Sequence, residues 1–102
     1  MNNKMFGLLG LACKAGKIKT GETAVKAAII DGDAYLVLVA TDASANTKKL
    51  FSDKCSYYEV PYFEYGTKEE LGRHTGTEYR ASIAVIEEGF AKSIQKKIEE
   101  EQ

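Results

Sequence analysis

The stretch from Lys14 to Lys26, KAGKIKTGETAVK, carries the residue types best suited to binding an anion. Four lysines and two glycines surround a turn between two apolar helical patterns. Lysines give a salt-dependent attraction to phosphate without reading sequence, and the free amides of a helix N-terminus form an anion site themselves. This stretch therefore predicts a surface that meets a phosphate backbone. The alternative interpretation is that the lysines only solvate an exposed turn.

A second candidate contact lies in the loop from Gly76 to Arg80, GTEYR, before the last predicted strand. Tyr79 offers a face on which an extruded base could stack, and Arg80 offers a planar cation. Arg73 stands nearby on the preceding helical segment. The alternative is a tyrosine packed under the loop beside an exposed arginine.

Residues for catalysis are sparse. His74 is the only histidine, and no serine or cysteine lies in a nucleophile motif beside it. Asp42 follows a buried strand, where open α/β sheets place ligands, but helix capping explains an aspartate there equally well. Cys13 and Cys55 have no metal-ligand spacing and are expected to be buried, reduced thiols. The sequence predicts no enzyme, cofactor, metal or small-molecule substrate.

Composition and charge indicate the domain organisation and the location of the protein. A chain of 102 residues with 44% hydrophobic content fits one compact domain, and its net charge of −1 argues neither for nor against a polyanionic partner. The first thirty residues carry a local excess of lysine, whereas residues 99–102 form an acidic tail. No stretch is long and apolar enough to span a bilayer, and no secretory signal is visible, so the expected location is the cytoplasm.

The first half of the chain predicts two helices joined by a short strand. Asn3 to Lys14 has apolar residues at helical spacing. Lys17 to Lys19 has the alternation of a brief edge strand. Thr20 is placed to cap the next helix, Gly21 to Asp31, with its hydroxyl.

The middle of the chain predicts two central strands around a long helix. Tyr35 to Ala40, YLVLVA, is a continuous apolar run typical of a strand covered on both faces. Ser44 can cap a helix that ends near Tyr57 or Tyr58. Val60 to Tyr65 follows as a second central strand.

The C-terminal third predicts a short helix, a strand and a long helix. Thr67 and Glu70 form a capping box for Lys68 to about His74. The pattern of Ala81 to Ile86 predicts a buried strand, and that of Glu88 to about Glu100 predicts a helix. Because helices alternate with strands along the chain, we expect a mixed sheet between two helical layers.

The order of these motifs resembles the superfamily of small ribosomal proteins that bind kink-turn RNA, which includes the archaeal large-subunit protein "seven-Ae". The most specific pieces are Val60-Pro61-Tyr62 followed by Leu71-Gly72-Arg73 and Gly76. Asp42-Ala43-Ser44 and Gly89-Phe90-Ala91 are similar to the bacterial YlxQ-like branch. The likeness spans about residues 4 to 98.

This resemblance implies a single-domain, three-layer α/β/α sandwich with a mixed four-stranded sheet and no catalytic activity. In the superfamily, RNA is held by the start of the second helix and by the loop before the last strand, which are Gly21 to Lys26 and Gly76 to Arg80 here. The expected RNA-binding residues are Lys14, Lys17, Lys19, Thr20, Gly21, Glu22, Thr23, Lys26, Arg73, Thr77, Glu78, Tyr79 and Arg80.

The chain also departs from the superfamily pattern. Kink-turn binders carry Asn or Lys and then Glu or Gln two and three residues after the glycine, where this chain has Thr23 and Ala24. The lysine expected six residues after the glycine comes one step early, at Lys26, which turns it about 100° around the helix. The leading hypothesis is an RNA-binding protein for a structured or kinked RNA, associated with the ribosome. The alternative is a protein-interaction domain of the same fold that has lost the RNA site.

Overall fold

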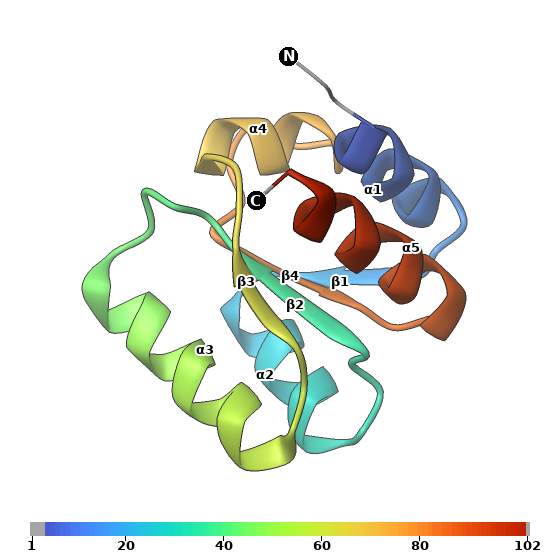
Figure 1. The fold of residues 1–102 in the computed structure, drawn as a ribbon. Helices are drawn as coiled ribbons and strands as arrows, with labels where there is room; N and C mark the ends of the chain where they lie inside the picture. The colour runs from blue at the N-terminus through green and yellow to red at the C-terminus, as the bar shows by residue number, and fades with distance from the viewer. Residues whose placement is uncertain (1–3, 102) are drawn as a thin grey trace.

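The computed structural model describes residues 4–101 and contains five helices and four strands (Figure 1). In chain order they are α1 (Lys4–Lys14), β1 (Ile18–Thr20), α2 (Glu22–Ile30), β2 (Leu36–Val39), α3 (Ala45–Tyr58), β3 (Tyr62–Glu64), α4 (Lys68–Arg73), β4 (Ser82–Val85) and α5 (Glu88–Glu100). These bounds agree with the predicted elements to within a few residues. The predicted start of the first helix at Asn3 lies outside the described residues.

The strands form one mixed sheet in the order β1-β4-β2-β3. β4 runs antiparallel to both β1 and β2, whereas β2 and β3 are parallel. Helices α2 and α3 cover one face of the sheet, and α1 and α5 cover the other with α4 beside them (Figure 1). The expected three-layer α/β/α sandwich with a mixed four-stranded sheet is confirmed.

The core lies on both sides of the two central strands. Every residue of β2 and β4 is buried, as their continuous apolar runs predict. Leu9 of α1, Phe51 of α3 and Ile94 of α5 are fully enclosed against them. Burying one such side chain stabilises the folded state by about 1.5–3 kcal/mol. The two buried strands therefore hold the loops at the ends of the sheet in place.

The prediction of a second central strand at Val60 to Tyr65 is wrong. β3 covers only Tyr62–Glu64, and it lies at the edge of the sheet, paired with β2. Its residues are half-buried or exposed, because a strand beside one neighbour is only partly covered. Pro61 lies just before the strand and takes part through its carbonyl oxygen, which accepts a hydrogen bond of 2.9 Å from the N–H of Val37.

Side-chain caps fix the starts of α3 and α4. The hydroxyl of Ser44 accepts a hydrogen bond of 3.1 Å from the N–H of Thr47. Thr67 and Glu70 form the predicted capping box, with both reciprocal bonds present. Because each cap satisfies an amide that the helix itself leaves free, the sequence alone was enough to locate both helix starts.

The two cysteines differ in how deeply they are buried. Cys55 is buried in the core, as predicted, but Cys13 is only half-buried, so the prediction of two buried thiols is wrong for Cys13. Cys13 sits in the last turn of α1, where the helix leaves the core. Over residues 4–101, no three metal-ligating side chains gather, and no helix has the length and apolar character needed to cross a membrane.

Candidate nucleic-acid interface

Gly21, not Thr20, is the N-cap of α2, so the predicted hydroxyl cap at Thr20 is wrong. Thr20 belongs to β1, where it pairs with Ile83 of β4. The N–H of Gly21 continues this contact by donating to the carbonyl oxygen of Ser82 at 3.3 Å. The chain then turns into the helix at a φ of 92° on Gly21, which residues with side chains rarely adopt. Sheet pairing therefore removes Thr20 from the capping position.

The first turn of α2 consequently has no side-chain cap. An α-helix leaves its first amides without internal partners, and their dipoles attract an anion. The exposed carboxylate of Glu22 stands in this first turn and forms an ion pair of 3.8 Å with Lys26. This start of α2 is a place where backbone N–H groups can meet a phosphate or a base acceptor.

Arg80 brings the loop before β4 against this helix start. A methyl group placed on Gly21 would lie 3.9 Å from Nη1 of Arg80. The backbone N–H of Arg80 donates to the carbonyl oxygen of Lys68 at 3.0 Å, which anchors the residue to the start of α4. Its Nε is buried and has no hydrogen-bond partner among the described residues. The structure thus joins two candidate surfaces that are separated by almost sixty residues of sequence.

The loop from Gly76 to Arg80 is held in place by close backbone contact with α4. The N–H of Thr77 donates to the carbonyl oxygen of Gly72 at 2.9 Å. A methyl group on Gly72 would lie only 2.6 Å from backbone atoms of Glu78 and Tyr79. Gly72 is therefore required for the loop to lie where it does. In the sequence, Gly72 is part of the Leu71-Gly72-Arg73 motif, but its role in packing the loop against α4 was not predicted. A glycine inside a short helix could have indicated this role.

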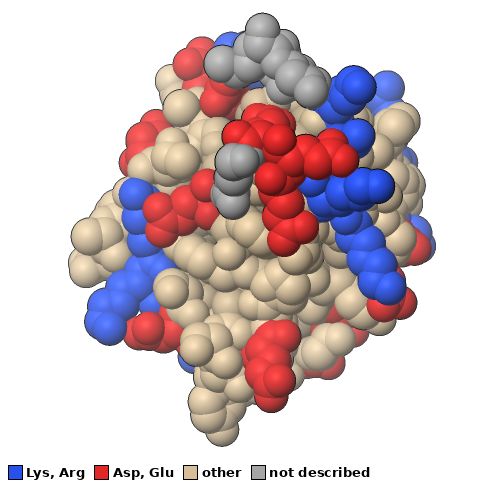
Figure 2. All heavy atoms as spheres, in the orientation of Figure 1, with Lys and Arg blue, Asp and Glu red and all other residues tan. Residues whose placement is uncertain are grey.

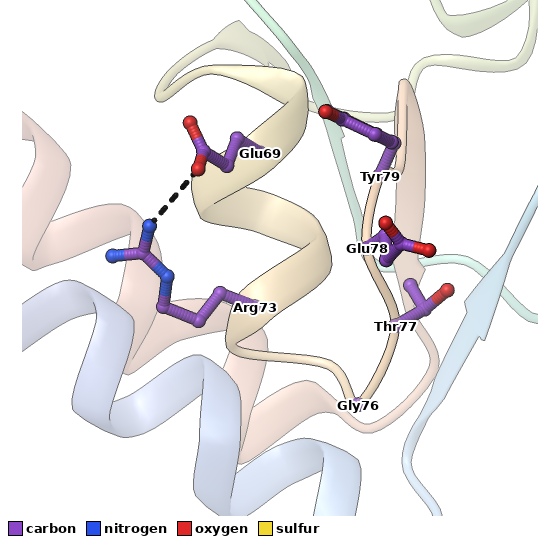
Figure 3. Close-up of a pocket in the computed structure, with 6 residues that line it drawn as sticks. All are labelled: Glu69, Arg73, Gly76, Thr77, Glu78 and Tyr79. Carbon is purple, nitrogen blue, oxygen red and sulfur yellow. Dashed lines mark hydrogen bonds and ion pairs between the residues drawn. The ribbon is translucent and has the colours of Figure 1, made fainter.

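An open hollow of about 570 Å³ lies between α4 and this loop, lined by Glu69, Arg73 and residues 76–79 (Figure 3). Tyr79 is 62% exposed at its rim, so it does not pack under the loop. Arg73 reaches toward Glu69, with which it forms an ion pair of 3.3 Å, while Thr77 and Glu78 point away on the other side of α4. Tyr79 is available for stacking, whereas Arg73 already has a carboxylate partner.

The lysines of the Lys14 to Lys26 stretch do not gather around Gly21. Lys14 and Lys17 precede β1, at the end of the sheet where β4 finishes, and the carbonyl oxygen of Lys17 accepts a bond from Ile86. β1 rises about 3.3 Å per residue, so these lysines lie roughly the length of the strand away from the start of α2. Lys19 lines a separate hollow beside α2 with Asp31 and Asp33. The positive charge is thus spread along β1.

Charges of both signs alternate on the face that Figure 2 shows, with acidic residues gathered around the C-terminal end of α5. Glu101 there accepts a hydrogen bond of 2.6 Å from the hydroxyl of Tyr65. This face is therefore less suited to a phosphate backbone than the start of α2.

Asp42 contacts the start of α4, which Thr67 caps. Its Oδ1 accepts a hydrogen bond of 2.8 Å from the N–H of Lys68, the first residue of that helix. Asp42 therefore has a structural partner, an amide that the helix itself leaves free, but it is not the N-cap residue of a helix.

Comparisons with known proteins agree with this fold. The family model described as "Ribosomal protein L7Ae/L30e/S12e/Gadd45 family" matches residues 3–95. "RNA-binding protein YlxQ" of Bacillus subtilis (strain 168) is 46% identical over 87% of the chain and 89% of that protein. The protein of the same name from Enterococcus faecium is 45% identical over 94% of the chain and 92% of its own length.

Among solved structures, a protein of unknown function from Bacillus halodurans C superposes with a TM-score of 0.93. It is 37% identical, and the match covers 96% of the chain and 99% of that protein. The two curated relatives carry the name of an RNA-binding protein and not of an enzyme, in agreement with the expectation from sequence.

Proposed function

Because the chain belongs to the ribosomal protein L7Ae/L30e/S12e/Gadd45 family, we propose that it is a non-catalytic, single-domain RNA-binding protein of the cytoplasm. The RNA is structured and kinked, as in a kink-turn, and the protein is associated with the ribosome. The name of the YlxQ relatives supports RNA as the partner. The contact between Arg80 and the uncapped start of α2 is the observation that carries the proposal.

The bound RNA places a phosphate or guanine edge at the start of α2. Backbone amides of the first turn donate to it, and the fork of Arg80 donates from the side. Tyr79 stacks on an unpaired base at the rim of the neighbouring hollow. This division of roles compensates for Thr23 and Ala24, which lack the longer polar side chains that kink-turn binders use there.

The lysines that precede α2 contribute a different interaction from that of Arg80 and Tyr79. Lys14, Lys17 and Lys19 are exposed along the approach to α2 and attract the backbone of a flanking RNA helix. A double charge reversal, Lys17→Glu with Lys19→Glu, is expected to weaken binding to kinked and straight RNA by the same factor. If RNA affinity is unchanged by this reversal, the lysines lie outside the interface.

Gel-shift titration with a kink-turn RNA and a straight duplex of equal length tests the proposal. We expect tighter binding to the kinked RNA. Arg80→Gln removes a charged hydrogen-bond donor worth about 1.5–3 kcal/mol, so affinity for the kinked RNA should fall about 10- to 150-fold. Lys92→Gln on α5 is the matched control, because it also removes one positive charge, from a side chain paired with Glu88.

Salt dependence adds an independent readout. If Arg80 contacts a phosphate, the slope of log affinity against log salt concentration should decrease by about 0.9 in Arg80→Gln. Equal weak binding to both RNAs would restrict the function to general RNA affinity. Absence of binding to either RNA at low salt would leave the alternative, a protein-interaction domain that has lost its RNA site.

A further inference from the structure

Exposed apolar side chains gather at the end of the molecule opposite the start of α2. Of the six large hydrophobic residues that are exposed within residues 4–101, four lie here: Ile30, Tyr35, Tyr57 and Tyr58. We call residues 30–35 and 57–61 the tyrosine end. Apolar side chains scattered singly over a surface are ordinary, but a gathering of them marks an interaction site.

The topology places these two segments together. β2 and β3 are parallel, and Val37 lies opposite Tyr62, so the residues that precede both strands arrive at the same end of the sheet. Helices α2 and α3 also finish there, at the lower end of the molecule in Figure 1. Gly21 and Arg80 lie at the other end of the sheet, where β2 finishes and β4 begins.

Two neighbouring tyrosines of this end contact each other, and one of them, Tyr57, is its most exposed large hydrophobic side chain. Tyr57 is 80% exposed, and its ring meets that of Tyr58 edge-on with centroids 4.9 Å apart. Both rings line a shallow hollow of about 500 Å³ together with Asp53 and Lys54. Two rings already in contact present a preformed aromatic surface.

Charge decides which partner fits. The eleven residues of the tyrosine end include three carboxylates, and the adjoining hollows add Asp53, Lys54 and Lys19. Carboxylates thus outnumber lysines by four to two, and this excess of negative charge repels the phosphates of RNA. The carboxylates also disfavour a second copy of this chain, because a twofold interface would bring the same carboxylates face to face. A partner with positive charge is complementary.

We propose that the tyrosine end is a docking surface for an arginine-rich segment of another protein. Guanidinium groups stack on tyrosine rings while they pair with carboxylates, and tyrosine and arginine are the residues that most often dominate binding energy at protein interfaces. The surface needs no RNA, so its success or failure is independent of the function proposed above.

Titration of the ¹⁵N-labelled full chain with an octa-arginine peptide at about 0.15 M salt, where long-range attraction is screened, tests this proposal. We expect the largest amide shifts in residues 31–35 and 53–61. The acidic end of α5 is an internal control, because Glu99 and Glu100 carry similar charge without exposed aromatic rings. Shifts centred on that end, or no shifts, would overturn the proposal.

Variants separate aromatic contact from charge. Tyr57→Ser with Tyr58→Ser should weaken octa-arginine binding about fivefold or more, and Glu59→Asn should weaken it while fitting the left-handed backbone at that position. Octa-lysine, with equal charge and poorer stacking, should bind several-fold more weakly. Unchanged affinity in the double tyrosine variant would refute the docking surface, as would a dimer in sedimentation that this variant abolishes.

Discussion

Replacing Gly72 by alanine should destabilise the protein, although the same change in a helix ordinarily stabilises it. Gly72 lies in α4, and its backbone is not in the left-handed region. Alanine is therefore acceptable to the backbone itself. The obstacle is the loop before β4, whose backbone at Glu78 and Tyr79 lies 2.6 Å from the position of the new methyl group.

The magnitude follows from that distance. An ordinary contact begins at 3.4 Å, so the methyl group is about 0.8 Å too close to a backbone that cannot rotate away. Overpacking of this kind costs about 1–3 kcal/mol, and the gain in helix propensity offsets up to about 1 kcal/mol of it. We expect a net loss of about 1–2 kcal/mol, which lowers Tm by about 5–15 °C.

Urea denaturation followed by circular dichroism measures this change, with Gly7→Ala as the matched control. Gly7 lies on the exposed side of α1, and a methyl group there would meet nothing within 4 Å. Gly7→Ala should therefore stabilise the protein by about 0.5–1 kcal/mol. If Gly72→Ala is as stable as the original chain, or gains as much as Gly7→Ala, the close packing of the loop on α4 is refuted.

Four further predictions concern a helix cap, the two thiols and a tyrosine. Ser44→Ala should lower the free energy of unfolding by about 1 kcal/mol in urea denaturation, since it removes the cap of α3; Ser44→Thr, which keeps a hydroxyl, should lose less. Burial raises the pKa of Cys55 from 9.0 to about 11. The unfolded chain releases this proton first, so stability should fall between pH 9 and 11, by up to about 2–3 kcal/mol; Cys55→Ala should flatten this part of the profile, and an equally steep profile would contradict the assignment. Burial, followed by the hydrogen bond to Glu101, also raises the pKa of Tyr65 and should deepen the loss above pH 10. At pH 8, Ellman's reagent should modify the half-buried Cys13 more than about tenfold faster than Cys55; equal rates would mean that the core opens readily around α3.

Local signals in the sequence were sufficient for most elements. Ser44 and the Thr67–Glu70 pair mark helix starts because a cap is a contact between near neighbours in the chain. The continuous apolar runs in β2 and β4 mark strands covered on both faces. What these signals could not give is the lateral order of strands, which depends on tertiary pairing, and β3 was consequently misplaced as a central strand.

The residues of the candidate site could likewise be predicted from local sequence, but their spatial arrangement could not. Gly21 and Arg80 were both named from residue type, but their contact depends on how β1 and β4 align. The same alignment takes Thr20 out of the capping position and leaves Lys14 and Lys17 at the far end of β1. Residue type can therefore indicate which residues could bind an anion. The register of the sheet determines which of these residues come into contact.

Amide shift mapping of the ¹⁵N-labelled chain with a kink-turn RNA tests the proposed interface most directly. The amides of residues 20–26 at the start of α2 and of residues 76–80 in the loop before β4 should shift together and saturate at the same RNA concentration. Their largest shifts should disappear in Arg80→Gln. Shifts that leave both segments unchanged and gather elsewhere on the chain would contradict an RNA site built from Gly21 and Arg80.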